Sequence, residues 1–229
     1  MKKYGLVIAI LAAFTSCKKE NYDIGNTPIN TDIKFELGIG IATKATASAF
    51  ERGDQVAVYA VEYASEEMPE LQIAGNFINN EKLTFNGSSW IADNTLYWSD
   101  RPCDFYALYP YQNLTSVEEH AFEIATDQNS TEAAGVLGGY EASDLLFAKA
   151  EKVSHSDGKV ALQFRHMMSK CIVNVIKGEK FEGELPEDIS VHIYNTVTTA
   201  DLNLANGSIE KYALGNRNTI TMKKVSSDK

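Results

Sequence analysis

The sequence predicts an all-β protein with a β-sandwich architecture. Apolar residues recur at every second position in many short segments, which is the period of a half-buried strand. Polar turn residues bound these segments at short intervals along the chain, as they do in sandwiches. Helical periodicity is confined to residues 116–122 and 141–148, each long enough for only a short helix or a turn.

The clearest predicted strand covers residues 32–42. It carries five apolar side chains on one face at a period of two, namely Ile33, Phe35, Leu37, Ile39 and Ile41. The other strands are expected at 55–63, 82–85, 94–98, 103–109, 159–166, 170–177, 190–194, 200–204, 208–212 and 219–222. Asn206-Gly207 predicts a hairpin between two of these strands, because both positions of a tight hairpin turn favour positive φ. The weakest pattern lies in residues 113–139, which we expect to be a long loop.

Charge and cysteine content exclude several classes of protein. The chain has 229 residues, a formal net charge of −10 and three cysteines. It lacks the basic balance needed to neutralise phosphates, so nucleic acid is excluded as a partner. It has too few cysteines for a disulfide scaffold and no Cys-x-x-Cys pair of the kind that binds zinc. The four scattered histidines also argue against a metal site, so we expect neither a metal nor a cofactor.

The N-terminus has the layout of a secretory signal. Residues 1–16 contain two lysines, a short apolar run and two small residues, directly before Cys17. The apolar run is too short to cross a hydrocarbon core of roughly 30 Å as a helix. The residues before Cys17 resemble a bacterial lipobox, with Phe14 where leucine is usual. This predicts a lipoprotein signal peptide over 1–16, acylation of Cys17 by chains such as palmitate, and a polar tether over 17–30; an ordinary signal peptide before an incidental cysteine is the alternative.

No catalytic arrangement is visible in the sequence. The chain lacks a Gly-x-Ser-x-Gly elbow, a His-Glu-x-x-His pair and a glycine-rich phosphate loop. The acidic pairs at 66–67 and 118–119 are adjacent in sequence, whereas a glycosidase needs two carboxylates that face each other across a cleft. We therefore expect a protein that is not an enzyme.

Two groups of residues leave alternatives open. Cys103 and Cys171 lie in predicted strands of an exported chain, so they are either candidates for a disulfide or two separate buried thiols. Trp90, Tyr97 and Trp98 are either a stacking platform for a sugar or ordinary core aromatics. Burial of these rings would remove the main support for a glycan site.

Eight short motifs follow one another over nearly the whole mature chain. They are Thr-Lys-Ala-Thr at 43–46, Phe-Glu-Arg-Gly-Asp-Gln-Val-Ala-Val-Tyr-Ala at 50–60, Trp90 with Tyr97-Trp98, Asp-Phe-Tyr-Ala-Leu-Tyr-Pro-Tyr at 104–111, Asp127-Gln128, Ser-Asp-Leu-Leu-Phe-Ala at 143–148, Leu-Gln-Phe-Arg-His-Met-Met-Ser-Lys at 162–170, and Asp-Leu-Asn-Leu-Ala-Asn-Gly-Ser at 201–208. Behind a lipobox, this order resembles the fimbrillin family, the lipoprotein precursors of type V pili in Bacteroidales.

The resemblance implies a fold and a structural role. It implies two β-sandwich domains of transthyretin-like pilin architecture, which we place at residues 31–165 and 166–229. The second domain is expected to be incomplete, because family members continue with further strands. The implied function is a structural subunit of a cell-surface fimbrium that serves in adhesion, either in the stalk or as an anchor or tip subunit. The implied location is the outer face of the outer membrane.

The resemblance also implies an assembly mechanism. An Arg- or Lys-specific protease would cut after the first strand, and a strand of another pilin subunit would fill the groove left behind. In this chain the detachable strand is the apolar set within 32–42, and the candidate cleavage sites are Lys44 and Arg52. The alternative is a surface lipoprotein that does not polymerise and binds a glycan or a host ligand.

Overall fold

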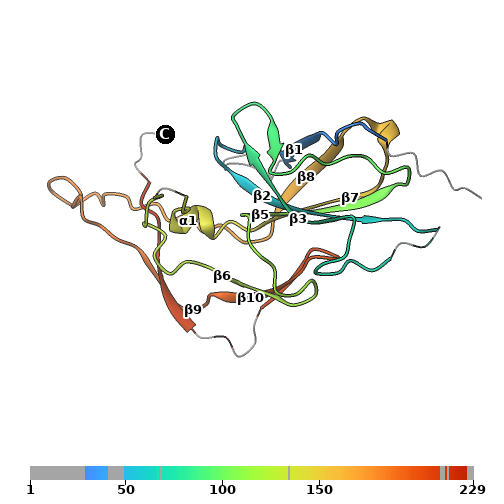
Figure 1. Ribbon diagram of the computed structural model, residues 1–229. Helices are drawn as coiled ribbons and strands as arrows, with labels where there is room; N and C mark the ends of the chain where they lie inside the picture. Colours follow the sequence, from blue (N-terminus) through green and yellow to red (C-terminus); the bar gives the residue numbers. More distant parts are fainter. Residues whose placement is uncertain are drawn as a thin grey trace, which may run out of the picture.

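A computed structural model describes residues 29–40, 49–65, 67, 69–133, 135–211, 215 and 217–225. These residues form three sheets, one short α-helix, α1 (Gly139–Ala142), and one 3-10 turn over His155–Asp157 (Figure 1). The predicted all-β class is confirmed. Within the described segments, no helix combines the length and apolar character needed to cross a membrane.

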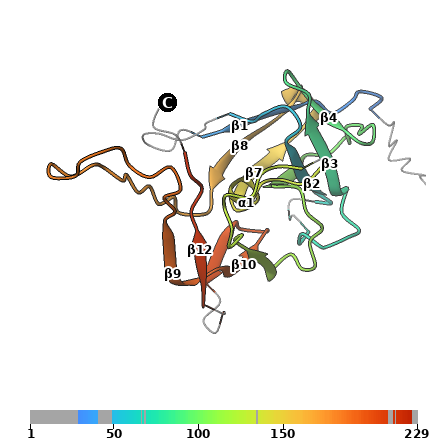
Figure 2. The ribbon, with the colours of Figure 1, turned by 90° about the vertical axis from the view of Figure 1, so that its left-hand side faces the viewer.

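Seven strands form the largest sheet, in the order β1-β8-β7-β5-β2-β3-β4. Their bounds are β1 Phe35–Ile39, β2 Gln55–Glu62, β3 Ile78–Phe85, β4 Trp90–Ala92, β5 Cys103–Tyr109, β7 Leu146–Val153 and β8 Val160–His166. The sheet curls until its two ends meet (Figure 2). There the N–H of Ile33 donates to the carbonyl of Leu96 at 2.8 Å, and the N–H of Trp98 donates to the carbonyl of Thr31 at 3.1 Å.

The curled sheet encloses the first hydrophobic core. Its members come from most strands of the sheet and include Val56, Val58, Phe105, Leu162 and Phe164. The intervening residues of β2 and β5 face the opposite way and enter a second core. Because these two strands are buried on both faces, their sequences are nearly continuous apolar runs.

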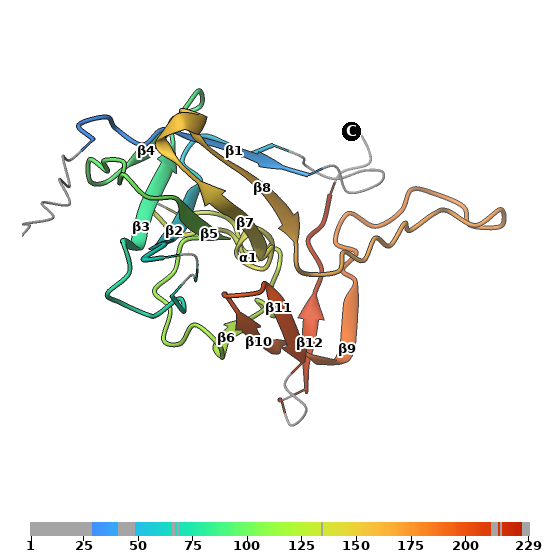
Figure 3. The ribbon, with the colours of Figure 1, turned by 90° about the vertical axis from the view of Figure 1, so that its right-hand side faces the viewer.

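A small sheet covers the second core from outside. It contains β6 (His120–Glu123), β10 (Thr199–Asn203) and β11 (Ser208–Lys211), in the order β11-β10-β6 (Figure 3). Phe122 and Leu202 of this sheet pack with Tyr59 and Tyr106 of the large sheet. The pairing of β6 with β10 joins residues on both sides of position 165. The division into domains at that position stays a prediction.

The predicted hairpin is present between β10 and β11, but its turn is wider than a two-residue turn. Of Asn206 and Gly207, only the glycine has positive φ, at 65°. Leu204 is fully buried in the second core, and its N–H donates to the carbonyl of Val117 at 2.7 Å. This anchoring draws the turn into the core and widens it to residues 204–207.

The turn also docks against the large sheet. The guanidinium of Arg165 donates to the carbonyl of Gly207 at 2.6 Å, and it lies 5.4 Å from the centroid of the Phe147 ring. A Cβ on Gly207 would lie 2.2 Å from an atom of that ring. Position 207 therefore requires a glycine, because its φ is positive and because the Phe147 ring leaves no room for a Cβ.

Two strands and a long connection complete the described structure. β9 (His192–Val197) and β12 (Arg217–Thr221) form a two-stranded antiparallel sheet. Residues 167–191, which we call the arm, link β8 to β9 and project from the body in all three ribbon views (Figures 1, 2 and 3). The predicted strand at 170–177 lies in the arm and is wrong, because no described strand lies beside it to complete its hydrogen bonds.

His120 of β6 is a buried histidine with neutral hydrogen-bond partners. The backbone N–H of Thr115 donates to its Nδ1 at 3.3 Å, which assigns the ring proton to Nε2, 3.1 Å from the side-chain oxygen of Gln112. Burial lowers the pKa of His120 below its ordinary value of 6.5, since a charged imidazolium would lose its hydration there.

The lowered pKa of His120 predicts a loss of stability in mild acid. Below about pH 6.5 the unfolded chain binds a proton that the folded chain resists, so the free energy of unfolding falls by up to about 1.4 kcal/mol per pH unit. Urea titrations between pH 7.5 and 5.5 should show this slope, and His120→Gln should flatten it. The exposed His192→Gln is the matched control, and equal flattening in both variants would contradict the assignment.

Candidate assembly strand and processing segment

The predicted detachable strand forms an edge of the large sheet. β1 runs parallel to β8, with Phe35 beside Val160 and Ile39 beside Phe164. The N–H of Val160 donates to the carbonyl of Lys34, and the N–H of Gly40 donates to the carbonyl of Phe164, both at 2.8 Å. Every other strand pair in the described sheets is antiparallel.

The side chains of this segment alternate as predicted. Ile33 is buried, while Phe35, Leu37 and Ile39 are half-buried and pack against the first core. The Phe35 ring meets the Phe105 ring edge-on, with 6.2 Å between the centroids. Ile41, the fifth residue of the predicted face, lies outside the described residues.

The arrangement of β1 has a direct physical consequence. Removing it would leave the edge of β8 without backbone partners and would uncover the apolar side chains of Val160, Leu162 and Phe164. Full burial of each apolar side chain of an incoming strand contributes about 1.5–3 kcal/mol. An edge and a core uncovered in this way have the chemistry that a strand of alternating apolar pattern would satisfy.

Phe50 anchors the chain where it enters β2. Its ring contacts Trp90, Tyr109 and Phe164 edge-on, with centroid distances of 4.9, 5.9 and 5.4 Å. The residue was not predicted as part of the site, because a single aromatic outside a strand gives no periodic signal; its position at the start of the motif at 50–60 is the only indication in the sequence.

Of the two candidate cleavage residues, Arg52 lies within the described residues. Lys44 and the lipidation residue Cys17 lie outside the described residues. Arg52 lies in a turn that is closed by mutual hydrogen bonds between Glu51 and Asp54, at 2.7 and 3.0 Å. Its Nε–H donates to the carbonyl of Asn86 at 2.9 Å, and the neighbouring Gly53 N–H donates to the carbonyl of Phe85 at 2.8 Å.

The structure does not contain a disulfide between Cys103 and Cys171; both thiols are free. Cys103 is buried in β5, and burial raises its pKa to about 12, so the thiol stays protonated and unreactive. Cys171 is exposed on the arm. The disulfide was a candidate because Cys171 was placed in a predicted strand at 170–177. Since that strand is not present, the basis for the disulfide is removed.

The aromatic residues considered for sugar stacking are mostly buried. Trp90 and Trp98 belong to the first core, with 9% and 3% of their surface exposed, and only Tyr97 is substantially exposed. The described residues therefore present no tryptophan platform to solvent.

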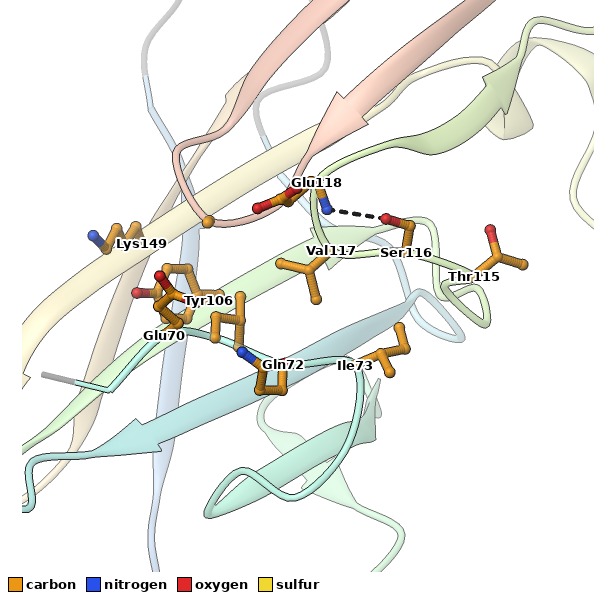
Figure 4. Close-up of a pocket in the computed structure, with 11 residues that line it drawn as sticks. Glu70, Gln72, Ile73, Tyr106, Thr115, Ser116, Val117, Glu118 and Lys149 are labelled. Atoms are coloured by element: carbon orange, nitrogen blue, oxygen red, sulfur yellow. Dashed lines mark hydrogen bonds between the residues drawn. The ribbon is translucent and has the colours of Figure 1, made fainter.

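A hollow of about 590 Å³ lies on the outer side of the large sheet (Figure 4). Tyr106, Lys149, Glu70 and Glu118 are among its lining residues. Lys149 is already engaged, since its ammonium lies 2.7 Å from Glu151 and 5.1 Å from the centroid of the Tyr106 ring. In the part of the chain that the structure describes, no group of three or more His, Cys, Asp or Glu side chains is placed to hold a metal ion.

The model of the fimbrillin-like family matches residues 43–229, which is most of the sequence. This chain belongs to the fimbrillin-like family. The matched region begins just beyond β1. It contains Lys44, Arg52 and all of the described strands except β1.

Individual relatives of this fimbrillin-like chain agree with that assignment. A Bacteroides ovatus protein that carries the name of a fimbrium tip subunit, Fim1C, is 26% identical over 205 residues. The match covers 76% of this chain and 36% of that protein, so the chain spans about a third of the length of this relative.

One solved structure shows a related fold. The crystal structure of a protein from Bacteroides uniformis, described as a cell adhesion protein, superposes with a TM-score of 0.56 at 21% identity. The match covers 86% of this chain and 72% of that protein. A fimbrial protein from Bacteroides ovatus is more distant, with a TM-score of 0.46 at 20% identity, and the match covers 88% of this chain and 43% of that protein.

Proposed function

We propose that this fimbrillin-like chain is a structural fimbrial subunit that assembles by strand exchange. The observation that carries the proposal is β1, an apolar strand at the edge of a sheet and the first of the described strands along the chain. Such a strand can leave without drawing another strand out of the sheet. The groove that remains would accept a strand of another pilin subunit, which restores both the backbone pairing and the core.

The processing site of the proposed mechanism is Lys44. A protease binds its substrate as an extended peptide, and cleavage after Arg52 would require the turn at 51–54 to open. Cleavage there would also remove Phe50 together with β1 and leave a gap beside Trp90 and Phe164. Cleavage at Lys44 leaves this anchor in the folded subunit.

The proposed location is the outer face of the outer membrane, with Cys17 carrying the lipid anchor. The name of the Bacteroides ovatus relative supports a minor position at the tip of the fimbrium. The alternative, a surface lipoprotein that binds a glycan and does not polymerise, loses its main support because Trp90 and Trp98 are buried.

Processing and assembly can be tested together. Outer-membrane fractions, heated gently in SDS, should show a ladder of regularly spaced bands for the wild type after treatment with a Lys/Arg-specific protease. Lys44→Ala, alone or with Arg52→Ala, should leave the uncut precursor and abolish the ladder. Arg52→Ala alone should be processed normally.

Lys34→Ala is the matched control, because it changes an exposed lysine directly before β1. This variant should be processed like the wild type. Normal processing of the double variant would overturn the cleavage assignment. Complete cleavage without any ladder would overturn strand exchange and favour a subunit that does not polymerise.

A further inference from the structure

The segment that carries β1 joins the two ends of the curled sheet. Thr31 and Ile33 hydrogen-bond to residues 96–98 on the β4 side, at 3.1 and 2.8 Å, and residues 34–40 hydrogen-bond to β8 on the other side. If this segment leaves, both sheet ends lose these backbone partners and the first core is uncovered between them. Unpaired edges and uncovered apolar surface draw two such ends together, and a sheet closed in this way has no place for another strand.

The Phe50 ring is a second connection between the same two sheet ends. Its centroid lies 4.9 Å from that of Trp90, in β4, and 5.4 Å from that of Phe164, in β8, and both contacts are edge-on. Phe164 faces Ile39 at the last position of the pairing between β1 and β8. Phe50 therefore contacts both sheet ends where the β1 groove finishes, and neither contact involves a residue of β1.

The turn that follows Phe50 fixes its position without help from β1. The N–H of Gly53 donates to the carbonyl of Phe85 at 2.8 Å, and the N–H of Phe85 donates to the carbonyl of Asp54 at 2.9 Å. The carboxylate of Asp54 also accepts a hydrogen bond from the hydroxyl of Tyr109 at 3.2 Å. These partners belong to the turn, to β3 and to β5, so they stay in place when β1 leaves.

A ring contact also joins the two sides at the other finish of the groove. Trp98 lies edge-on to His155, with 6.2 Å between the ring centroids. Trp98 belongs to the segment that pairs with Thr31, and His155 belongs to the 3-10 turn shortly before β8. Contacts outside β1 therefore set the width of the groove at both of its limits.

We propose that Phe50 is a positioning residue for strand exchange, which keeps β4 and β8 apart at the Ile39 limit of the groove after β1 has left. A groove held open in advance spares an incoming strand the cost of separating the sheet ends, so the strand binds faster. The role in a cut subunit rests on the proposed function. The bridge between the sheet ends is present in the uncut chain and can be tested there.

The uncut full chain tests the bridge itself. Because β1 and Phe50 both join the sheet ends, each compensates in part for loss of the other. The decrease in melting temperature for Phe50→Ala combined with Leu37→Ala should exceed the sum of the two single decreases by at least about 2 °C. Phe85→Ala is the matched control, because the Phe85 ring also packs on Trp90, at 5.2 Å, but lies with it on the β4 side. Its effect should add to that of Leu37→Ala, and simple addition for Phe50→Ala as well would overturn the proposal.

Uptake of a peptide tests the role after cleavage. The full chain, cut at Lys44, is mixed with a fluorescent peptide of residues 31–42, and binding is followed by fluorescence anisotropy. Phe50→Ala should lower the association rate constant at least about tenfold, and Phe50→Tyr, which keeps the ring, should restore it. Phe85→Ala should bind the peptide as fast as the wild type, although it also lowers stability.

The outcomes separate the role of Phe50 from strand exchange itself. Equal association rates for the wild type and Phe50→Ala would overturn the role of Phe50 and leave strand exchange intact. A cut wild type that takes up no peptide would overturn strand exchange, and the role of Phe50 with it.

Discussion

Gly207→Ala is expected to lower the free energy of unfolding by about 2–5 kcal/mol. Two costs add. The backbone at Gly207 has φ of 65°, a conformation that costs an L-residue about 1–2 kcal/mol. The new Cβ would also lie 2.2 Å from the Phe147 ring and 2.8 Å from the Arg165 guanidinium, so the docked turn must move.

Gly158→Ala separates these two costs. Gly158 also has positive φ, at 74°, but a Cβ there would meet no atom within 4 Å. Only the backbone cost applies, and we expect a loss of about 1 kcal/mol. Urea denaturation of both variants measures the difference. Equal losses would mean that the turn does not dock on Phe147 as the structure shows.

Leu37→Asp is expected to destabilise the uncut precursor by on the order of 3 kcal/mol. The substitution removes a side chain that packs on the first core and places an unpaired carboxylate against it. Glu36→Gln is the matched control on the neighbouring residue. Glu36 is exposed and pairs with the exposed Lys159, so loss of its charge should cost less than about 1 kcal/mol.

The same variant tests whether β1 is detachable. After cleavage at Lys44 and departure of the strand, the folded remainders of wild type and Leu37→Asp are identical in sequence, so their melting temperatures should coincide. A difference that persists after complete cleavage would show that the strand stays bound. Identical melting temperatures before cleavage would place Leu37 outside the core.

The sequence predicted well wherever one face of a strand is buried and the other is exposed. The alternation through Ile33, Phe35 and Leu37 located β1, and the alternation of Val160, Leu162 and Phe164 located β8. The pairing of these two strands could not be predicted. β1 is the first strand of the large sheet along the sequence and β8 is the last. The spacing of apolar residues and the composition of a strand do not indicate which other strand lies beside it.

Other elements were missed for identifiable reasons. The second half of β7 contains Lys149, Glu151 and Lys152, whose charges interrupt any apolar pattern, so a short helix or turn was expected where the strand begins. β6 falls in the stretch expected to be a long loop; it has four residues and is held by its pairing with β10. In the arm the error was the reverse, because a strand was predicted at 170–177 and none is present. A segment with the pattern of a strand does not form one unless another strand lies beside it.

The pairing of β1 with β8 also fixes a sequence of events. Chains emerge from synthesis and export with their N-terminal end first, so residues 35–39 are available long before residues 160–164. Contacts between distant segments form only after the entropy of closing the intervening loop has been overcome. Among the described strands, β1 is thus the first to be made and the last of its sheet to find a partner strand, and until then the edge of β8 remains open to any strand of suitable pattern. If the strand is exchanged as proposed, the subunit passes through the same receptive state once during its own folding.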